Sequence, residues 1–284
     1  MPSQIYRLGF IGAGKLAGSV IRGLMRAKFC SPSEIAASEP NEQTRVALER
    51  DIGIHLTAEN AEVAEKAETV FIAVKPPMVI PVLSELEDKL EKKLVISLAG
   101  GVRIASMEKA VSARVMRALT NTPSAICRAA TGIARGSRST NADVDLTKKI
   151  FRAIGVVVEI KEEQIDAVTA LSGSGPAFVY TVIEALAAGG VKMGLANDVA
   201  MELAIQTARG AAEIMLETKM SPEELRRMVV TPGGTTAAGL AVMEKLGTKE
   251  GLIAAVDAAT KRGQEMADET KLETRILKSD TSTK

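Results

Sequence analysis

The chain has 284 residues, of which 46% are hydrophobic, and its 36 Lys and Arg residues nearly balance its 35 Asp and Glu residues. This balance gives no electrostatic attraction for a phosphate backbone, and an aromatic content of 2% leaves few rings for base stacking. Both properties argue against a nucleic-acid partner. At roughly 100–200 residues per domain, two domains are expected.

The cysteines and the N-terminal residues indicate the cellular compartment of the protein. Cys30 and Cys127 lie far apart in the sequence, which offers no disulfide framework and is typical of a reducing compartment. The first residues lack the charge of a secretory signal, and no apolar run approaches the ~20 residues that span a bilayer. We therefore expect a cytoplasmic protein without a membrane partner.

Short apolar runs alternate with amphipathic stretches in the first half of the chain. Near-continuous apolar runs such as Thr69–Val74 are typical of strands covered by helices on both faces of a parallel sheet. The alternation predicts right-handed βαβ units in a doubly wound α/β fold. Strands are predicted at Arg7–Ile11, Glu34–Ser38, Ile54–Leu56, Thr69–Val74, Leu94–Leu98 and Ala113–Arg117, and helices at Lys15–Ala27, Glu42–Asp51, Met78–Leu90 and Ile104–Lys109.

The pattern changes near residues 160–164. Two further strands, Thr131–Arg135 and Val156–Ile160, flank a helix at Asp145–Ala153 and are expected to extend the sheet. After Ile160 the sequence has helical spacing and no strand pattern. Helices are predicted from Ile165, from Pro176, from Asn197 or Asp198 to Glu217, from the Ser221 capping box, at Thr236–Lys245 and at Lys249–Leu272.

A glycine turn joins the first predicted strand to the first helix: Gly12-Ala13-Gly14-Lys15-Leu16-Ala17. The first glycine permits a tight turn, the second lets the backbone approach a pyrophosphate, and the small third residue lets helix and strand pack closely. The helix N-terminus offers N–H groups and a positive dipole end to phosphates. The context predicts a Rossmann-type dinucleotide-binding domain over 1–161, an all-helical domain over 162–276 and a polar tail over 277–284.

Two further segments follow predicted strands, at the end of the sheet where such a fold binds its cofactor. Glu39 ends the second strand, where a carboxylate accepts from the adenosine ribose 2′-OH of NAD and repels a 2′-phosphate. This favours NADH over NADPH, although Glu39 pointing to solvent, or Arg45 reaching a phosphate, remains an alternative. Lys75 follows the Thr69–Val74 strand and either faces the cofactor or is a solvated loop lysine.

Two glycine-rich, hydroxyl-rich loops occur in the helical half: Leu171-Ser-Gly-Ser-Gly-Pro-Ala177 and Thr231-Pro-Gly-Gly-Thr-Thr236. Each precedes a helix, where free N–H groups and Ser or Thr donors suit a carboxylate. Simple capping by Ser174 and Thr235 is the alternative. Two such loops in one domain favour a substrate site.

The residue types that are missing also constrain the chemistry. The single histidine, His55, lies on a predicted strand in the first half, and we interpret it as structural; no His/Cys metal cluster occurs. Reduction of a carbonyl usually requires a base or a metal to handle the hydroxyl proton. A C=N substrate can arrive already protonated and needs less, which favours imine reduction.

At these motifs the chain resembles the pyrroline-5-carboxylate reductase family over roughly residues 7–272. The order of the Leu-Ser-Gly-Ser-Gly-Pro-Ala and Pro-Gly-Gly-Thr-Thr segments is the most specific part of the resemblance. The matching segments are Gly9–Gly14, Ala73–Pro76, Thr120–Pro123, Asp166–Thr169, Leu171–Ala177, Gly189–Gly194 and Pro232–Thr236.

The resemblance implies reduction of L-1-pyrroline-5-carboxylate to L-proline by NADH or NADPH, with interlocked dimers through the helical domain that assemble further. It implies catalytic roles for Thr236, Ser174 and Thr169. The implied substrate contacts are Glu163, Thr169, Ser174, Gly233, Gly234, Thr235 and Thr236. The implied cofactor contacts are Gly12, Ala13, Gly14, Lys15, Leu16, Glu39, Asn41, Asn60, Ala73, Val74, Lys75, Pro76, Ser97, Ala99 and Gly100.

Two residues depart from the family pattern. Met228 stands where many members carry Asn or Asp, and Glu39 where NADP-using members often have Ser, Thr or Arg. Two alternatives therefore stay open: a nucleotide-binding sensor or scaffold that lost its chemistry, supported by Met228, and a related dehydrogenase acting on another small carboxylate. The second lacks a catalytic lysine in a suitable setting.

Overall fold

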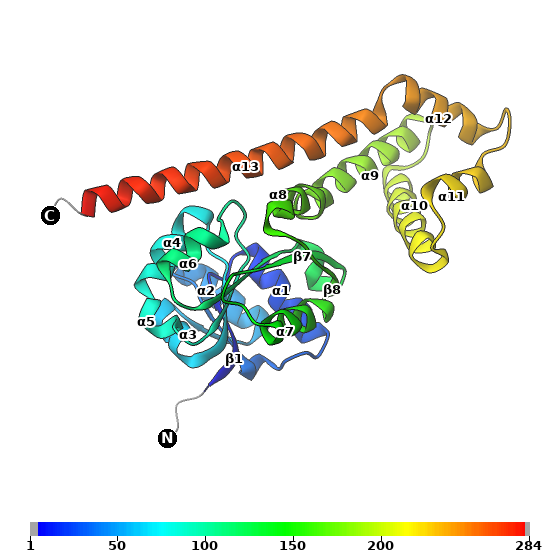
Figure 1. Cartoon of the computed structure of the whole chain (residues 1–284). Coiled ribbons are helices and arrows are strands. Elements are labelled where there is room, and N and C mark those ends of the chain that lie inside the picture. Colours follow the sequence, from blue (N-terminus) through cyan, green and yellow to red (C-terminus); the bar gives the residue numbers. More distant parts are fainter. Residues whose placement is uncertain (1–4, 282–284) are drawn as a thin grey trace. The chain divides into compact units, whose positions relative to one another are not determined.

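The computed structural model describes residues 5–281, and their side chains as far as residue 269 (Figure 1). The chain divides into two compact units. The first unit comprises Met1–Ser174 and Ala258–Lys284, and the second unit comprises Gly175–Asp257. The predicted division at residues 161 and 162 stays a prediction.

The first unit contains one eight-stranded sheet in the order β3-β2-β1-β4-β5-β6-β7-β8. Strands β1 to β6 are parallel, β7 is antiparallel to β6, and β8 is parallel to β7. The chain therefore crosses from β3 on one side of β1 to β4 on the other. The strands are β1 (Tyr6–Ile11), β2 (Ile35–Ser38), β3 (His55–Thr57), β4 (Ala67–Ile72), β5 (Leu94–Ser97), β6 (Arg114–Leu119), β7 (Ala129–Arg135) and β8 (Gly155–Glu159).

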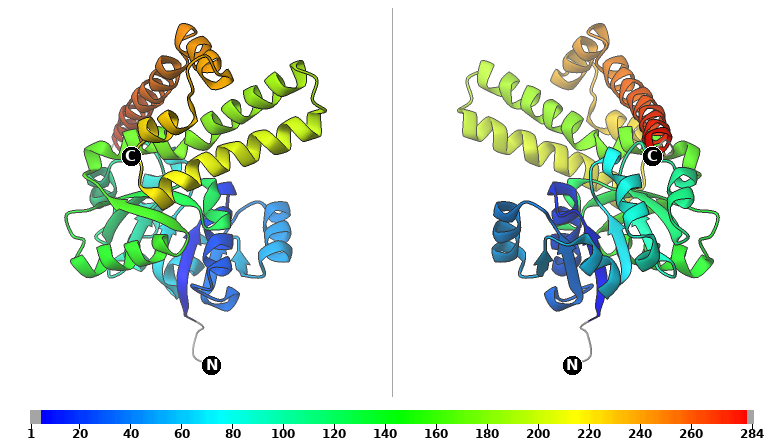
Figure 2. Two further views of the ribbon diagram at one scale, coloured as in Figure 1. Left: turned by 90° about the vertical axis from the view of Figure 1, so that its right-hand side faces the viewer. Right: turned by 90° about the vertical axis from the view of Figure 1, so that its left-hand side faces the viewer.

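Helices cover both faces of this sheet (Figure 2). One apolar cluster joins the sheet to α3 (Asn60–Lys66), α4 (Pro76–Glu85) and α6 (Ile104–Ala110). The other joins it to α1 (Lys15–Arg26) and α7 (Asn141–Arg152). The first unit also has α2 (Glu42–Ile52), α5 (Glu87–Leu90), α8 (Ile165–Val168) and the short turns η1 (Pro32–Glu34), η2 (Thr122–Ile126), η3 (Glu162–Gln164) and η4 (Thr169–Gly173).

The doubly wound fold and all eight predicted strands are confirmed, with ends shifted by up to two residues. The prediction missed α3, a short and mostly polar helix. It also joined α4 and α5 into one helix, although the two are separated at Leu86. Helix α4 begins at Pro76, earlier than predicted, because proline is tolerated in the first turn of a helix.

The second unit is entirely helical. It contains α9 (Gly175–Lys192), α10 (Asn197–Thr218), α11 (Pro222–Val229), α12 (Thr235–Lys245) and the first part of α13 (Thr248–Thr281). Helices α9 and α10 lie side by side as a hairpin (Figure 2) and pack through Ala187, Ala200 and Ala204. Many of its large apolar side chains, including Val179, Tyr180 and Leu203, remain exposed.

The C-terminal prediction is partly wrong. Helix α13 continues to Thr281 and does not end near Leu272, because residues such as Lys, Glu and Leu sustain a helix and neither Gly nor Pro follows Gly263. Of the predicted tail over 277–284, residues 277–281 belong to α13, and 282–284 lie outside the described residues. From β8 to residue 281 no strand occurs, as predicted.

One helical stretch bears on the expectation about apolar runs. The helical stretch Glu162–Lys192 is long and apolar enough to cross a membrane, a criterion that also fits helices of soluble proteins. The stretch was missed because Ala and Gly interrupt its larger apolar residues. Most of it is exposed in the described structure.

Candidate functional site

The carboxyl ends of the central parallel strands gather the expected cofactor residues at one edge of the sheet. The Gly12 N–H donates to the Ser38 carbonyl (3.1 Å), the Ala73 N–H to Ile11 (2.8 Å), and the Leu98 N–H to Ile72 (2.9 Å). These bonds extend the pairing of β1, β2, β4 and β5 beyond the strand ends. Strand order reverses between β1 and β4, the point where open α/β sheets bind ligands.

Gly12 and Gly14 have the geometry that the glycine turn requires. Gly12 has φ +90°, and a Cβ there would lie 2.9 Å from the carbonyl carbon and oxygen of Ala73. No atom lies within 4 Å of the corresponding position at Gly14. Gly14 is the N-cap of α1 and provides no side-chain cap, and Ala17 is buried. The N-terminus of α1 is thus open to a phosphate, so these residues fit a dinucleotide.

The segment after β2 is held by its own polar contacts. One oxygen of the Glu39 carboxylate accepts from the Asn41 N–H (3.1 Å), and the Asn41 side chain caps α2 through the Thr44 N–H (2.9 Å). Arg45 Nη1 donates to the carbonyls of Glu39 (2.8 Å) and Pro40 (3.1 Å). The Glu39 carboxylate therefore remains beside the end of β2, half-buried.

Asn60 and the segment 73–76 complete the β2 and β4 sides of this edge. Asn60 begins α3, and its Oδ1 accepts from the Ser38 hydroxyl (2.7 Å). Pro76 and Pro77 occupy the first turn of α4, so this helix start lacks two N–H donors. Lys75, its N-cap, is exposed.

The segment after β5 meets the first expected substrate residue. Ser97 is fully buried and accepts from the Ala99 N–H through its hydroxyl (3.3 Å). A Cβ on Gly100 would lie 3.9 Å from Cγ2 of Thr169. The structure thus places Thr169 beside Gly100, the last residue of the expected cofactor stretch.

Thr169 begins a π-helical turn, η4, that the sequence analysis missed. The Ser174 N–H donates to the Thr169 carbonyl (2.9 Å), and the Thr169 hydroxyl donates to the Ile165 carbonyl (2.8 Å). Asn121, nearly buried after β6, donates to the Ser172 carbonyl (3.0 Å). Such turns occur frequently at functional sites. The glycines of the Leu-Ser-Gly-Ser-Gly motif were the available signal. Glu163, on η3, is exposed.

The other expected substrate residues, Gly233 to Thr236, lie in the second unit. Gly233 has φ +72°, and Gly234 is the N-cap of α12. A Cβ on Gly234 would lie 2.4 Å from Oγ1 and 3.1 Å from the carbonyl oxygen of Thr231, so a side chain there would displace the Thr231 hydroxyl. Thr235 and Thr236 are the exposed first residues of the helix. The loop therefore presents hydroxyls and first-turn N–H groups, as an anion site requires.

Met228, the departure noted in the sequence, also lies in the second unit. It is exposed on α11 and lines an apolar pocket of about 350 Å³ together with Met215 of α10 and Leu225. The side chain at this position thus contributes apolar surface and no hydrogen bond.

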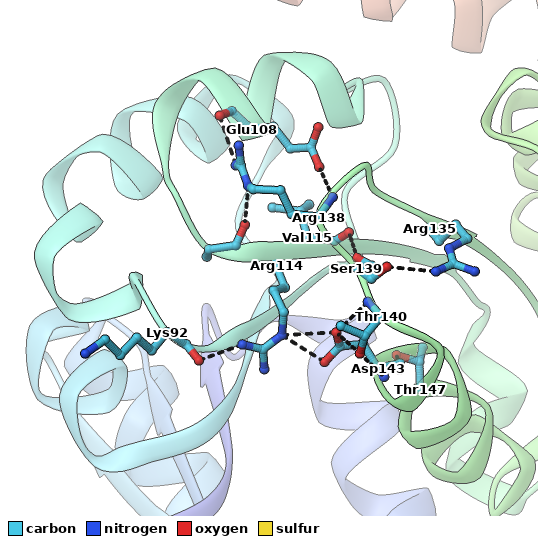
Figure 3. Close-up of polar contacts among 11 residues, drawn as sticks. Lys92, Glu108, Arg114, Val115, Arg135, Arg138, Ser139, Thr140, Asp143 and Thr147 are labelled. Carbon is cyan, nitrogen blue, oxygen red and sulfur yellow. Dashed lines mark hydrogen bonds and ion pairs between the residues drawn. The ribbon is translucent and has the colours of Figure 1, made fainter.

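Two polar clusters lie away from the carboxyl edge. His55 stacks on Tyr6, with ring centroids 5.4 Å apart, and bonds Glu62 (3.0 Å). At the first residue of β6, Arg114 contacts Asp143 of α7 (3.0 Å), at the opposite end of the strand from the site (Figure 3). Among side chains of residues 5–269, no group of three His, Cys, Asp or Glu residues could hold a metal.

Comparison with known proteins covers almost the whole chain. Residues 162–266 match the family model described as pyrroline-5-carboxylate reductase dimerisation. Residues 7–101 match the model described as NADP oxidoreductase coenzyme F420-dependent. The pyrroline-5-carboxylate reductase of Methanosarcina acetivorans is 40% identical to this chain, and the alignment covers 92% of this chain and 97% of that protein. The pyrroline-5-carboxylate reductase of Synechocystis is also 40% identical, and the alignment covers 92% of this chain and 98% of that protein. A Plasmodium falciparum pyrroline carboxylate reductase, solved with NADP bound, aligns with a TM-score of 0.85 and 30% identity over 92% of this chain and 98% of that one.

Proposed function

The chain belongs to the pyrroline-5-carboxylate reductase family, and we propose which of its residues bind the cofactor and which bind the substrate. It is an oxidoreductase that reduces L-1-pyrroline-5-carboxylate to L-proline with NAD(P)H, the last step of proline biosynthesis. The observation that carries the residue assignment is the position of Thr169 beside Gly100 at the carboxyl edge of the sheet.

The carboxyl edge binds the dinucleotide. The open N-terminus of α1 and the close turn at Gly12 support pyrophosphate binding by Gly12–Leu16. Glu39, Asn41 and Asn60 hold the adenosine end, and Ala73–Pro76 with Ser97, Ala99 and Gly100 hold the nicotinamide end. When bound, NAD(P)H supplies the hydride.

The cofactor preference is for NADH. The Glu39 carboxylate lies beside the end of β2, where it can accept from a ribose 2′-OH and would repel a 2′-phosphate. Arg45 is engaged with the carbonyls of Glu39 and Pro40, which favours the same preference. Release of Arg45 toward a 2′-phosphate would give the opposite preference.

The substrate is held by hydroxyl and amide donors. The hydroxyls of Thr235 and Thr236 and the first-turn N–H groups of α12 suit the substrate carboxylate, with Gly233 and Gly234 forming the turn, and the Thr236 hydroxyl bonds the ring nitrogen. Thr169 and Ser174 position the ring next to the nicotinamide end of the cofactor site, with Glu163 as a further contact. Because a protonated C=N bond already carries its proton, hydride addition at carbon completes the amine without a general base.

The enzyme acts as a homo-oligomer. The match of residues 162–266 to a dimerisation family and the exposed apolar side chains of α9 and α10 support a dimer. We further propose assembly of dimers into a larger homo-oligomer, in the cytoplasm, without nucleic-acid or membrane partners.

A substrate panel tests the proposal. Purified protein is mixed with NADH or NADPH and with pyrroline-5-carboxylate, a six-membered cyclic imine carboxylate or a small 2-oxo acid, and product is measured by chromatography. We expect proline formation with the highest kcat/KM for pyrroline-5-carboxylate and NADH. A folded protein that binds dinucleotide but reduces none of these compounds would favour the sensor alternative.

A further inference from the structure

Arg117 is a charged side chain in the interior of the first unit. It lies on β6 opposite Ser97 of β5, and its side chain is fully buried. Burial lowers the pKa of its guanidinium, and the neighbouring Glu162 carboxylate opposes this shift. A buried charge costs several kcal/mol unless partners compensate it, so the contacts of this side chain decide its role.

The guanidinium connects two segments that are far apart in the sequence. Nη1 donates to Glu162 Oε1 (3.2 Å), and Nη2 lies 3.4 Å from the Ala99 carbonyl oxygen, at the long limit of a hydrogen bond. The same Glu162 oxygen accepts from the Ile104 N–H (2.6 Å) at the start of α6. Arg117 thus joins the expected nicotinamide segment to η3.

A second ion pair runs in parallel. Arg103 Nη2 contacts Asp166 Oδ2 at 2.6 Å, and the Asp166 side chain is only 2% exposed. Residues 99–104 are therefore attached to residues 162–166 at two points. Thr169 follows Asp166 by less than one helical turn, so these pairs help fix its position against Gly100.

The remaining nitrogen of Arg117 argues against a purely stabilising role. Its Nε is buried and has no hydrogen-bond partner among the described residues. An incompletely paired buried ion is a poor source of stability, and well-packed apolar residues often replace such pairs at no cost.

We propose that Arg117 is a positioning residue for hydride transfer: it holds the Ala99–Gly100 backbone and the η3–η4 segment in the register that places Thr169 beside the nicotinamide end. This inference rests on the proposed cofactor role of Ala99 and Gly100 and the substrate role of Thr169. Displacement of reacting groups by about 1 Å can slow a reaction roughly 100-fold, so small changes here have large kinetic effects.

The test compares full-length variants in the proline-forming assay. Arg117→Lys keeps the positive charge but cannot reach both the Glu162 carboxylate and the Ala99 carbonyl oxygen. Arg117→Met removes the positive charge. The double variant Arg117→Met/Glu162→Gln leaves no uncompensated buried charge and guards against a folding defect. Arg114→Met is the matched control, because Arg114 also pairs with a carboxylate, at the other end of the same strand.

We expect kcat to fall between about 10- and 100-fold in Arg117→Met and in the double variant, with the KM for NADH changed by less than about threefold. The primary deuterium isotope effect on kcat should rise, and Arg117→Lys should be intermediate. Arg114→Met should lower the unfolding midpoint and leave kcat unchanged.

Two results would overturn the inference, and they are distinguishable. If the wild type forms proline and the double variant keeps wild-type kcat and isotope effect, Arg117 is only structural. If the wild type itself forms no proline, the proposed function fails and the inference fails with it.

Discussion

The backbone of Gly12 lies directly against the backbone of Ala73, with no room for a Cβ: one built on Gly12 would lie 2.9 Å from both the carbonyl carbon and the oxygen of Ala73. Gly12 also has φ +90°, which L side chains rarely adopt. The contact joins the ends of β1 and β4, on the two sides of the point where strand order reverses.

Gly12→Ala should therefore destabilise the fold by at least about 2 kcal/mol, from strained backbone and displaced neighbours. Urea unfolding at neutral pH measures this loss. Gly53→Ala is the control, because Gly53 has φ +70° but open space around it, and should cost only about 1 kcal/mol. Equal losses at both positions would mean that the Ala73 contact contributes nothing.

Gly14→Ala should separate binding from folding. Gly14 has φ −67°, and no atom lies within 4 Å of its Cβ position, so the variant should unfold at nearly the wild-type urea concentration. Its methyl group would stand where the pyrophosphate approaches, and we expect NADH affinity to fall at least about tenfold, or 1.4 kcal/mol. A fluorescence titration with unchanged affinity would place the pyrophosphate elsewhere.

Glu39→Ser should raise the ratio of kcat/KM for NADPH to that for NADH by about tenfold, since it removes a negative charge next to the expected 2′-phosphate position. Steady-state kinetics with both cofactors measures the ratio. Glu49→Ser, on the far end of α2, removes an equal charge and should leave the ratio unchanged. A constant ratio in Glu39→Ser would mean that its carboxylate does not face the ribose.

Thr236→Ala should lower kcat by about 100-fold and leave NADH affinity nearly unchanged, because Thr236 belongs to the proposed substrate loop. Stopped-flow turnover and a separate NADH titration distinguish the two effects. Thr248→Ala changes another threonine at a helix start of the second unit and should behave as wild type. An equal loss of NADH binding in Thr236→Ala would contradict the assignment.

Glu62 should contribute to stability in a pH-dependent way. Hydrogen bonds from Lys66, and then Thr57 and His55, lower the pKa of its carboxyl from 4.5 to about 2, against desolvation. A lowered folded-state pKa stabilises the protein above pH 4.5, and this contribution is lost as the pH falls toward 2. Glu62→Gln should therefore cost about 1 kcal/mol at pH 7, on the scale of partly exposed ion pairs.

Urea unfolding of wild type and Glu62→Gln from pH 7 down to pH 3 checks this sign. The difference in unfolding free energy between the two proteins should stay constant down to about pH 4.5 and then shrink as the pH falls further. Glu68→Gln, at an exposed position of β4, serves as control. A difference that grows on acidification would exclude the proposed contribution.

The sequence predicted those parts of the fold that depend on local pattern. The apolar runs identified the strands, and the Gly12–Ala17 turn identified the strand-to-helix junction, because both signals lie within a few consecutive residues. Helix α3 was missed because its seven residues carry three charges and few apolar side chains. The continuation of α13 beyond Leu272 is not indicated by the sequence, because the polar residues near its end are also typical of a chain segment outside a helix.

The missed parts of the site depend on residues distant in sequence. Asn121 holds the π-helical turn through Ser172, 51 residues later, and Arg117 reaches Glu162 across 45 residues. Neither pairing leaves a periodic signal. An arginine inside an apolar strand such as β6 is the one local anomaly that could have indicated Arg117.

The most direct test of the central claim is to follow the transferred hydrogen. Purified protein is incubated with pyrroline-5-carboxylate and NADH carrying deuterium on either face of nicotinamide C4, and the proline is analysed by mass spectrometry and NMR. Direct hydride transfer predicts L-proline with one deuterium at C5 from one of the two labelled faces and none from the other. Proline without deuterium from both faces, or no proline at all, would contradict it.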